Sequence, residues 1–428
     1  MSARTTTSRL TLAGVLALAS LTLVGPSGAT AAPVTAQATV ATALPPLSAV
    51  DQRIKNRLAT RSRNSRLGSD LTGLVTDARS GRVIWSKDRN ERQLPASNTK
   101  IVTAVTALSS FGPRHRFTTR VVKGTYWRHV VLVGAGDPSL TWGKVDTLAA
   151  STAKAVRARG VRRVTVYVDD TLFPRHSLAY GWKRSYVPTD VRPVRALVVG
   201  KRKVWDTSID AGKIFAGRLA ARGVKVRAVT RGRARAGATT LGSVRGGYLK
   251  TMVGYMLRTS DNDHAEALHR LVARKAGYNP TWWGARMAQR KVLSRLGVDL
   301  GSSALYDGSG LSRADRLTAA QLVATLSLAF DGEHPRLAPL RYGAMAIAGR
   351  TGTLAASYLR YTSSPTKCAA GLIQAKTGSL SGVITLSGFA RGADGRVKLF
   401  SFLLNGVPST LTTRQAVDRL SSTITGCW

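Results

Sequence analysis

One stretch of the sequence decides the fold: Pro95-Ala96-Ser97-Asn98-Thr99-Lys100. Apolar residues follow it at helical spacing, and Gly112-Pro113 ends the pattern. Ser97 and Lys100 therefore stand three positions apart at the opening of a predicted helix, where their side chains project from one face. A lysine whose charged form is disfavoured by burial can take the proton of a serine hydroxyl. The pair is a candidate nucleophile and base, although this spacing also arises by chance.

Two further motifs strengthen that interpretation: Ser260-Asp261-Asn262 and Lys376-Thr377-Gly378. The first offers a hydroxyl that could relay a proton and an amide that could hold a substrate carbonyl. In the second, lysine and threonine can bind a carboxylate, and glycine allows a substrate backbone to approach a strand edge. The three elements in this order are typical of penicillin-binding proteins and class A β-lactamases.

Other segments make the resemblance more specific: Gly134-Ala135-Gly136-Asp137-Pro138, Asp307-Gly308-Ser309-Gly310-Leu311-Ser312-Arg313 and Gly352-Thr353-Leu354. With them, the sequence closely resembles the serine D-alanyl-D-alanine carboxypeptidases/endopeptidases of low molecular mass. These are the class C penicillin-binding proteins of peptidase family S13. The resemblance spans roughly residues 50–426.

The resemblance implies an α/β (α+β) fold of the penicillin-binding transpeptidase/β-lactamase type. A five-stranded antiparallel sheet and a helical subdomain would enclose the site, with an α/β domain inserted after the first motif. The reaction would be cleavage before the terminal D-alanine of peptidoglycan stem peptides, with or without cleavage of cross-links. β-Lactam antibiotics would be covalent inhibitors, and no cofactor or metal is implied.

The resemblance implies that Ser97 is the acylated nucleophile and that Lys100 is its base. Ser260 would relay a proton to the leaving D-alanine. Substrate would be bound by Asn262, Lys376, Thr377, Gly378 and Ser379. The backbone N–H groups of Ser97 and Ser379 would form the oxyanion hole. Many family members have threonine at the position of Ser379, which should matter little because the backbone donates. The insert is also shorter than in long members, so a nested third domain is reduced or missing.

The order of predicted elements supports the same organisation. Strand-like runs near the start and end of the chain suggest one sheet assembled from both ends, with an amphipathic helix running from Leu249 through the second motif to Leu268. The predicted domains are a signal peptide (1–31), a linker (32–47), a catalytic domain (48–112 and 246–428) and an inserted domain (113–245).

Composition and charge limit the cellular compartments and the binding partners that the protein can have. The chain has 428 residues, 64 Lys and Arg and 22 Asp and Glu, a net charge of +42. Residues 1–31 have two arginines before an apolar stretch, then Ala29-Thr30-Ala31, which is the layout of a signal peptide, with an uncleaved anchor as the alternative. Export disfavours nucleic acid as the partner. Export favours anionic wall polymers or a membrane surface as partners, because the chain would keep a net charge of about +40 after cleavage of the signal peptide.

Several residues keep two interpretations. Cys368 and Cys427 form a candidate disulfide, or are two separate buried thiols. A basic run within residues 53–66 is either a solvated helix face or a contact with wall polymer or membrane. His264, Glu266 and His269 lack metal-ligand spacing and are expected on a helix surface, Asp307 in a glycine-dependent turn, and Asp169-Asp170 at a solvated strand end.

Two other functions remain open: a serine β-lactamase, which would need fast deacylation, and an inactive wall-binding module of the same fold, which would form no ester at Ser97.

Overall fold

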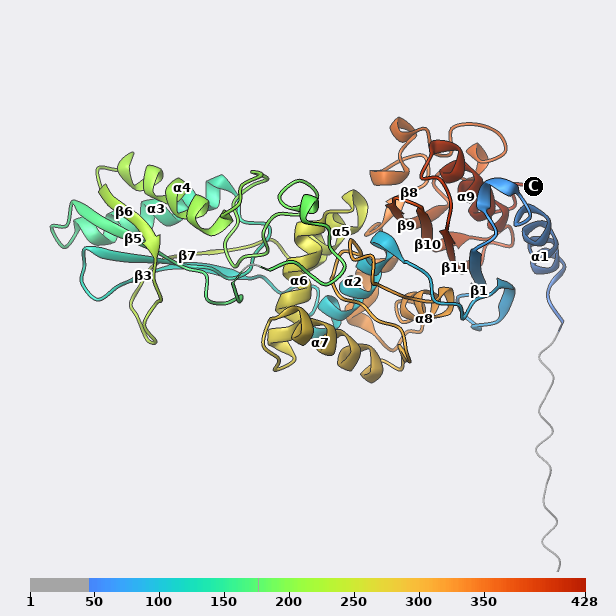
Figure 1. Cartoon of the computed structure of the whole chain (residues 1–428), viewed down its shortest axis with the longest axis horizontal. Helices are drawn as coiled ribbons and strands as arrows, with labels where there is room; N and C mark the ends of the chain where they lie inside the picture. The colour runs from blue at the N-terminus through green and yellow to red at the C-terminus, as the bar shows by residue number, and fades with distance from the viewer. Residues whose placement is uncertain (1–45, 176) are drawn as a thin grey trace, which may run out of the picture. The chain divides into compact units, whose positions relative to one another are not determined.

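The computed structural model describes residues 46–175 and 177–428. The predicted signal peptide and nearly all of the predicted linker lie outside these residues. Leu47–Trp428 form one unit, shown with its element labels in Figure 1. Within this part of the chain, no helix has the length and apolar composition that crossing a membrane requires.

In the described residues the first sheet has six strands in the order β2-β1-β11-β10-β9-β8, all antiparallel. Their bounds are β1 Leu71–Asp77, β2 Val83–Lys87, β8 Ala346–Ile347, β9 Ile373–Leu380, β10 Val383–Arg391 and β11 Val397–Asn405. Because β1 pairs with β11, both ends of the chain meet in one sheet, as predicted. The edge strand β8 makes six strands where five were expected.

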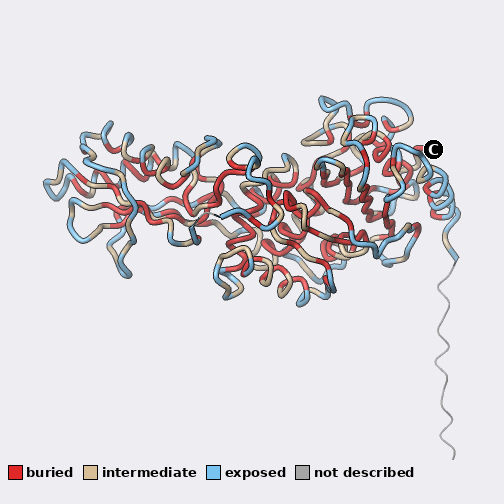
Figure 2. Tube along the Cα trace, in the orientation of Figure 1, coloured by how far each residue is buried: buried red, intermediate tan, exposed pale blue. Residues whose placement is uncertain are grey.

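Both faces of this sheet are covered, as the alternation along β11 shows. Phe400 and Phe402 pack in one core with Ile54 of α1 (Ala49–Arg61) and Leu420 of α9 (Leu411–Ile424). Leu399 and Leu403 belong to the other core, which contains the remaining helices of the catalytic half. The central strands β1, β10 and β11 are accordingly almost entirely buried (Figure 2).

The helix that begins after Ser97 lies at the centre of the second layer. This helix, α2 (Thr99–Phe111), contacts the four helices α5 Leu249–Thr259, α6 Asn262–Lys275, α7 Trp282–Arg295 and α8 Ala319–Ser327. Residues 99–108 are all buried, which removes Lys100 from water.

The single helix predicted from Leu249 to Leu268 is wrong, because the chain breaks at Ser260. That residue takes a left-handed conformation (φ 60°, ψ 35°) that ends α5, and the Asp261 side chain then accepts from the His264 N–H to cap α6. The break places the second motif between two helices, so its polar side chains are not confined to the faces of one continuous helix.

A second sheet lies within the predicted insertion and has the order β6-β5-β4-β3-β7. Its elements are β3 Thr118–Lys123, β4 His129–Val133, α3 Trp142–Arg157, β5 Arg163–Asp169, α4 Thr207–Ala220, β6 Lys225–Arg231 and β7 Thr240–Arg245. β4, β5 and β6 are parallel and joined by the two helices, which form a separate core with the sheet. This is consistent with an inserted α/β domain; its bounds at 113 and 245 stay a prediction.

Short 3-10 turns connect these elements: η1 Ser65–Leu67, η2 Ala96–Asn98, η3 Arg184–Tyr186, η4 Pro335–Arg341, η5 Gly352–Leu354, η6 Ala356–Tyr358 and η7 Lys367–Ala369.

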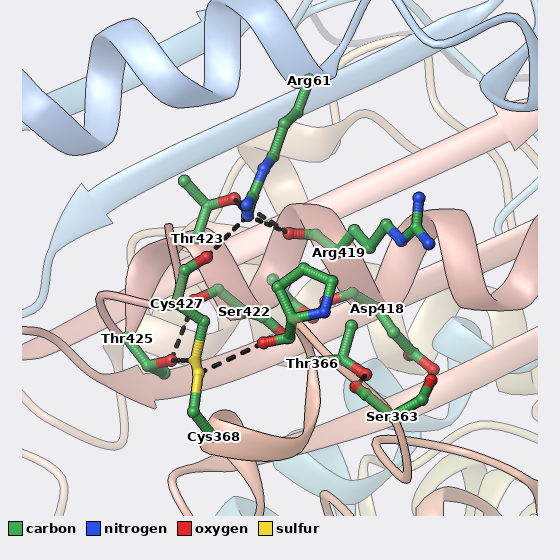
Figure 3. Close-up of a disulfide and its surroundings, with 12 residues drawn as sticks. Arg61, Ser363, Thr366, Cys368, Asp418, Arg419, Ser422, Thr423, Thr425 and Cys427 are labelled. Atoms are coloured by element: carbon green, nitrogen blue, oxygen red, sulfur yellow. Dashed lines mark hydrogen bonds between the residues drawn. A yellow bond between two sulfur atoms is a disulfide. The ribbon is translucent and has the colours of Figure 1, made fainter.

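The two cysteines form a disulfide that ties the end of the chain to the segment before β9 (Figure 3). The Cα atoms of Cys368 and Cys427 lie 6.1 Å apart. Arg61 of α1 donates to the Cys427 carbonyl (2.8 Å) and to the Thr423 hydroxyl (2.7 Å). The bridge and these bonds hold the last residues against α1 and α9.

Candidate active site

The turn that carries Ser97 is held between two neighbouring segments. The Thr385 hydroxyl of β10 donates to the Pro95 carbonyl (3.0 Å), while Ala96 has a left-handed φ of 46°. A Cβ at Gly310 would lie 1.8 Å from the Ala96 carbonyl oxygen, so only glycine fits there. Ser97, the candidate nucleophile, is therefore fixed by backbone packing around the turn η2 that contains it.

Lys100 makes three hydrogen bonds that define the site. Its Nζ lies 2.9 Å from Ser97 Oγ, 2.7 Å from Asn262 Oδ1 and 2.7 Å from the Ser309 carbonyl oxygen. The side chain is fully buried. Burial lowers the pKa of the Lys100 ammonium to about 8, and the carboxylates of Asp307, Glu266 and Asp261 only partly offset that effect. Proton exchange with Ser97 is thus accessible near neutral pH.

Ser260 and Lys376 form a second hydroxyl–ammonium pair. Lys376 Nζ lies 2.9 Å from Ser260 Oγ and 2.6 Å from the Thr377 carbonyl oxygen. Burial, together with the nearby charge of Lys100, holds the pKa of Lys376 well below its usual value. Burial disfavours the charged form of both lysines, and a bound anion would stabilise their ammonium forms, so this region is receptive to an anion.

The third motif lies inside strand β9. Gly378 pairs with Thr385 of β10, and a Cβ at this glycine would lie 2.1 Å from the Thr385 hydroxyl oxygen and 3.1 Å from the Pro95 carbonyl oxygen. The absence of a side chain lets β9 run beside the nucleophile turn. The Thr377 hydroxyl lies 2.8 Å from that of Thr353, and Ser379 follows in the strand.

Asn262 connects the site to the insertion, a link that no sequence pattern indicated. Its Nδ2 donates to the Asp190 carbonyl (2.8 Å) while its Oδ1 accepts from Lys100. One residue on, Asp263 accepts from the Arg192 backbone N–H (2.8 Å) and pairs with its guanidinium (2.9 Å). A segment of the predicted insertion thus fixes the orientation of the amide that binds Lys100.

Buried carboxylates shape the loop that supports Lys100. Glu266 accepts from the backbone N–H groups of Gly308 (2.9 Å) and Ser309 (2.8 Å), whose carbonyl in turn faces Lys100. Asp307 accepts from the backbone N–H groups of Gly310 and Ser312, both at 2.7 Å, in the expected glycine-dependent turn. Burial and the neighbouring Asp307 raise the pKa of Glu266 to about 8.

The expectation that the residues after the second motif lie on a helix surface is wrong. Glu266 and His269 are fully buried, and His264 is 8% exposed with its Nδ1 2.9 Å from Asp261. Burial lowers the pKa of His269 to about 3, so this imidazole is neutral. Helix α6 is covered by α2, α5 and α7, which a single helical period could not reveal.

The expected solvated strand end at Asp169-Asp170 is also wrong. Asp169 is buried and accepts from the backbone N–H groups of Thr171 (3.0 Å) and Ala234 (2.8 Å), whereas Asp170 pairs with Arg195 and Arg231. Searching residues 46–175 and 177–428 finds no group of three or more His, Cys, Asp or Glu side chains placed to hold a metal ion.

Comparison with known proteins decides the family. A family model described as the D-Ala-D-Ala carboxypeptidase 3 (S13) family matches residues 54–201 and 187–424. The chain belongs to this family. Carboxypeptidase Rv3627c of Mycobacterium tuberculosis is 33% identical over 375 residues, covering 83% of this chain and 80% of that protein. The S13 family acts on peptidoglycan peptides outside the cytoplasm, so the predicted family and enzymatic class are confirmed.

A second relative and a solved structure agree with this assignment. The D-alanyl-D-alanine carboxypeptidase of Actinomadura sp. strain R39 is 28% identical over 446 residues, covering 80% of this chain and 79% of that protein. The crystal structure of penicillin binding protein 4 (dacB) from Haemophilus influenzae matches with a TM-score of 0.74 at 19% identity, covering 85% of this chain and 97% of that one. The likeness confirms the predicted fold.

Proposed function

We propose that Ser97 is the nucleophile of this D-Ala-D-Ala carboxypeptidase and that Lys100 activates it. The observation that carries the proposal is the 2.9 Å contact between Ser97 Oγ and the Nζ of Lys100, whose side chain is fully buried. With a pKa of about 8, about a tenth of the Lys100 side chains are uncharged at pH 7. An uncharged amine can accept the hydroxyl proton.

Acylation then follows in two steps. Ser97 Oγ forms a bond to the carbonyl carbon of the penultimate residue, and the carbonyl π electrons move to oxygen, where the backbone N–H groups of Ser97 and Ser379 stabilise the charge. Collapse of this intermediate breaks the C–N bond. Ser260 donates a proton to the departing D-alanine nitrogen and is reprotonated from Lys376, 2.9 Å away. Water then attacks the ester carbonyl carbon and its released proton restores Lys376; the C–O bond to Ser97 breaks, and Lys100 returns its proton to Ser97 Oγ, which completes the cycle.

Substrate recognition is assigned to the anion-receptive end of the site. The terminal carboxylate of the stem peptide would lie against Lys376 and the hydroxyl of Thr377, with Gly378 leaving room for the backbone. Its negative charge stabilises the ammonium form of Lys376, which burial alone disfavours. Asn262 would hold the substrate amide in the orientation that the Asp190 carbonyl imposes.

Penicillin is expected to acylate the same serine. A structure of the Haemophilus protein is described as complexed with a β-lactam (TM-score 0.66, 20% identity, covering 86% of this chain and 98% of that one). A long-lived adduct distinguishes the peptidase from a β-lactamase, which would release the product rapidly. An inactive wall-binding module would form no adduct.

The test is release of D-alanine from a pentapeptide stem, measured together with labelling by a fluorescent penicillin. Ser97→Ala should abolish both. Ser379→Ala is the matched control, because it removes a hydroxyl from the same site but keeps the backbone N–H, and it should retain most activity. No release by the wild type, or equal release by Ser97→Ala, would refute the assignment. Cross-linked muropeptides would measure any additional endopeptidase activity.

Export and wall attachment complete the proposal. The net charge of +42 in an enzyme of an extracytoplasmic family supports salt-sensitive binding to anionic wall polymers, with a membrane surface as the alternative partner. Binding to isolated walls should fall strongly between low salt and about 0.5 M salt, where screening acts within a few ångströms. Unchanged binding would count against electrostatic attachment.

A further inference from the structure

The charge of the protein is concentrated in the insertion. Residues 113–245 contain 28 Lys and Arg and seven Asp, with no Glu. On its sheet, Val164, Val166 and Val168 of β5 are buried beneath α3 and α4, which lie on the same side of the strands (Figure 1). Since side chains alternate along a strand, Arg163 and Thr165 project from the opposite face.

A hollow of about 660 Å³ opens where β4 and β5 begin. Six of its lining residues are basic or imidazole side chains: Arg128, His129, Arg159, Arg162, Arg163 and Arg227. The described residues that line it include no Asp or Glu. All five arginines are exposed. We call this feature the arginine hollow.

The arginines of the hollow differ from others in the insertion. Arg222 pairs with Asp146 at 2.6 Å and Arg231 with Asp206 at 2.7 Å. For the five guanidinium groups of the hollow, no described carboxylate lies within ion-pair distance, 4.0 Å. Like charges gathered without counter-charges repel one another, and a bound polyanion would remove that repulsion.

The composition of the hollow favours phosphate over other anions. The hollow is lined by arginines and by no lysine. The planar guanidinium group of arginine can donate two parallel hydrogen bonds to phosphate oxygens. The Arg159 guanidinium is already oriented, because it stacks over the Trp127 ring at 4.6 Å from the centroid. The elements of the hollow, β4 to β6 and their loops, are separate from α2, α5, α6 and β9, which carry the catalytic motifs.

We propose that the arginine hollow binds the phosphodiester backbone of an anionic wall polymer. The inference rests on the proposed wall attachment and gives it a location, but it does not depend on the Ser97 chemistry. An enzyme bound to this polymer would be held close to the peptidoglycan, where its substrate stem peptides lie.

The experiment compares two triple variants of the full-length protein. The first combines Arg128→Gln, Arg163→Gln and Arg227→Gln in the hollow. The second combines Lys55→Gln, Arg57→Gln and Arg63→Gln, which removes the same charge from the exposed basic run at α1. The probe is poly(glycerol phosphate) of about ten units, with binding measured by calorimetry across a salt series.

The hollow variant should bind the probe at least about tenfold more weakly than wild type, and its salt slope should fall by about 2, since three phosphate contacts are lost. The α1 variant should change Kd less than about threefold. Hydrolysis of a short stem peptide and the unfolding temperature should match wild type in both, which separates this result from failure of the catalytic proposal.

Three outcomes would overturn the inference. Equal weakening in the two variants would mean that only total charge matters. Equal affinity of the wild type for polygalacturonate of matched charge would remove the preference for phosphate. Binding to phosphatidylglycerol vesicles that depends on the hollow, without binding to the soluble probe, would assign the surface to a membrane instead.

Discussion

Acylation of Ser97 should depend steeply on pH, because the reactive form of Lys100 is the uncharged amine. Burial lowers the pKa of Lys100 to about 8. The uncharged fraction is then about 1% at pH 6, about half at pH 8 and about nine tenths at pH 9. The acylation rate constant should therefore rise about fifty-fold from pH 6 to pH 8 and less than twofold above it.

The assay is single-turnover acylation by a fluorescent penicillin at saturating concentration, followed from pH 6 to pH 9. Saturation separates the chemical step from the affinity for the carboxylate, which involves Lys376 and its own titration. Lys100→Arg is the control, since a guanidinium stays protonated throughout and should abolish acylation at every pH. A rate constant that is flat between pH 6 and pH 8, or the same rise in Lys100→Arg, would refute Lys100 as the base.

Two further predictions concern stability, and a third concerns the turn that contains Ser97. Replacing Cys368 and Cys427 by serine should lower the free energy of unfolding by up to about 4 kcal/mol, because the bridge closes a loop of 59 residues; denaturant unfolding measures this, and a loss near zero would contradict it. Asp418→Asn should cost about 3–5 kcal/mol by leaving the buried Arg360 guanidinium, now 2.7 Å from the carboxylate, without its counter-charge, whereas an unchanged midpoint would show the pair to be dispensable. Gly310→Ala should reduce penicillin labelling at least tenfold, as its Cβ would clash with the nucleophile turn at a φ of 80°; normal labelling would show that the turn can shift.

The side chains of the candidate site could be named from the sequence because each motif is local. Ser97 lies in the turn η2 directly before α2 and Lys100 in the first turn of that helix, and Lys376 to Ser379 are adjacent in one strand, so spacing alone relates them. The contacts between one motif and another could not be predicted from spacing. The acceptor for Asn262 is the Asp190 carbonyl, 72 residues away, and backbone carbonyls leave no residue-type signal.

Burial was the other source of error. The polar residues of α6 have a charged composition typical of a solvated helix, yet Glu266 and His269 are fully buried. Their environment comes from three other helices and from the loop at Gly308, 42 residues further along. Ser260 was also misplaced within a continuous helix, because a left-handed serine is rare and a helical apolar pattern continues on both sides of it.

The pairing of β1 with β11 has a consequence for when the enzyme becomes active. Leu71 lies opposite Leu404, so the first hairpin cannot join its sheet until nearly the whole chain is available. Ser97 and Lys376 come together only at that closure. Pairings between such distant segments form slowly, because the entropy cost of closing a long loop comes before any stabilising contact. A partly synthesised chain therefore has Ser97 but lacks the strand β9 that lies beside it, so the candidate site is assembled only when most of the chain has been made.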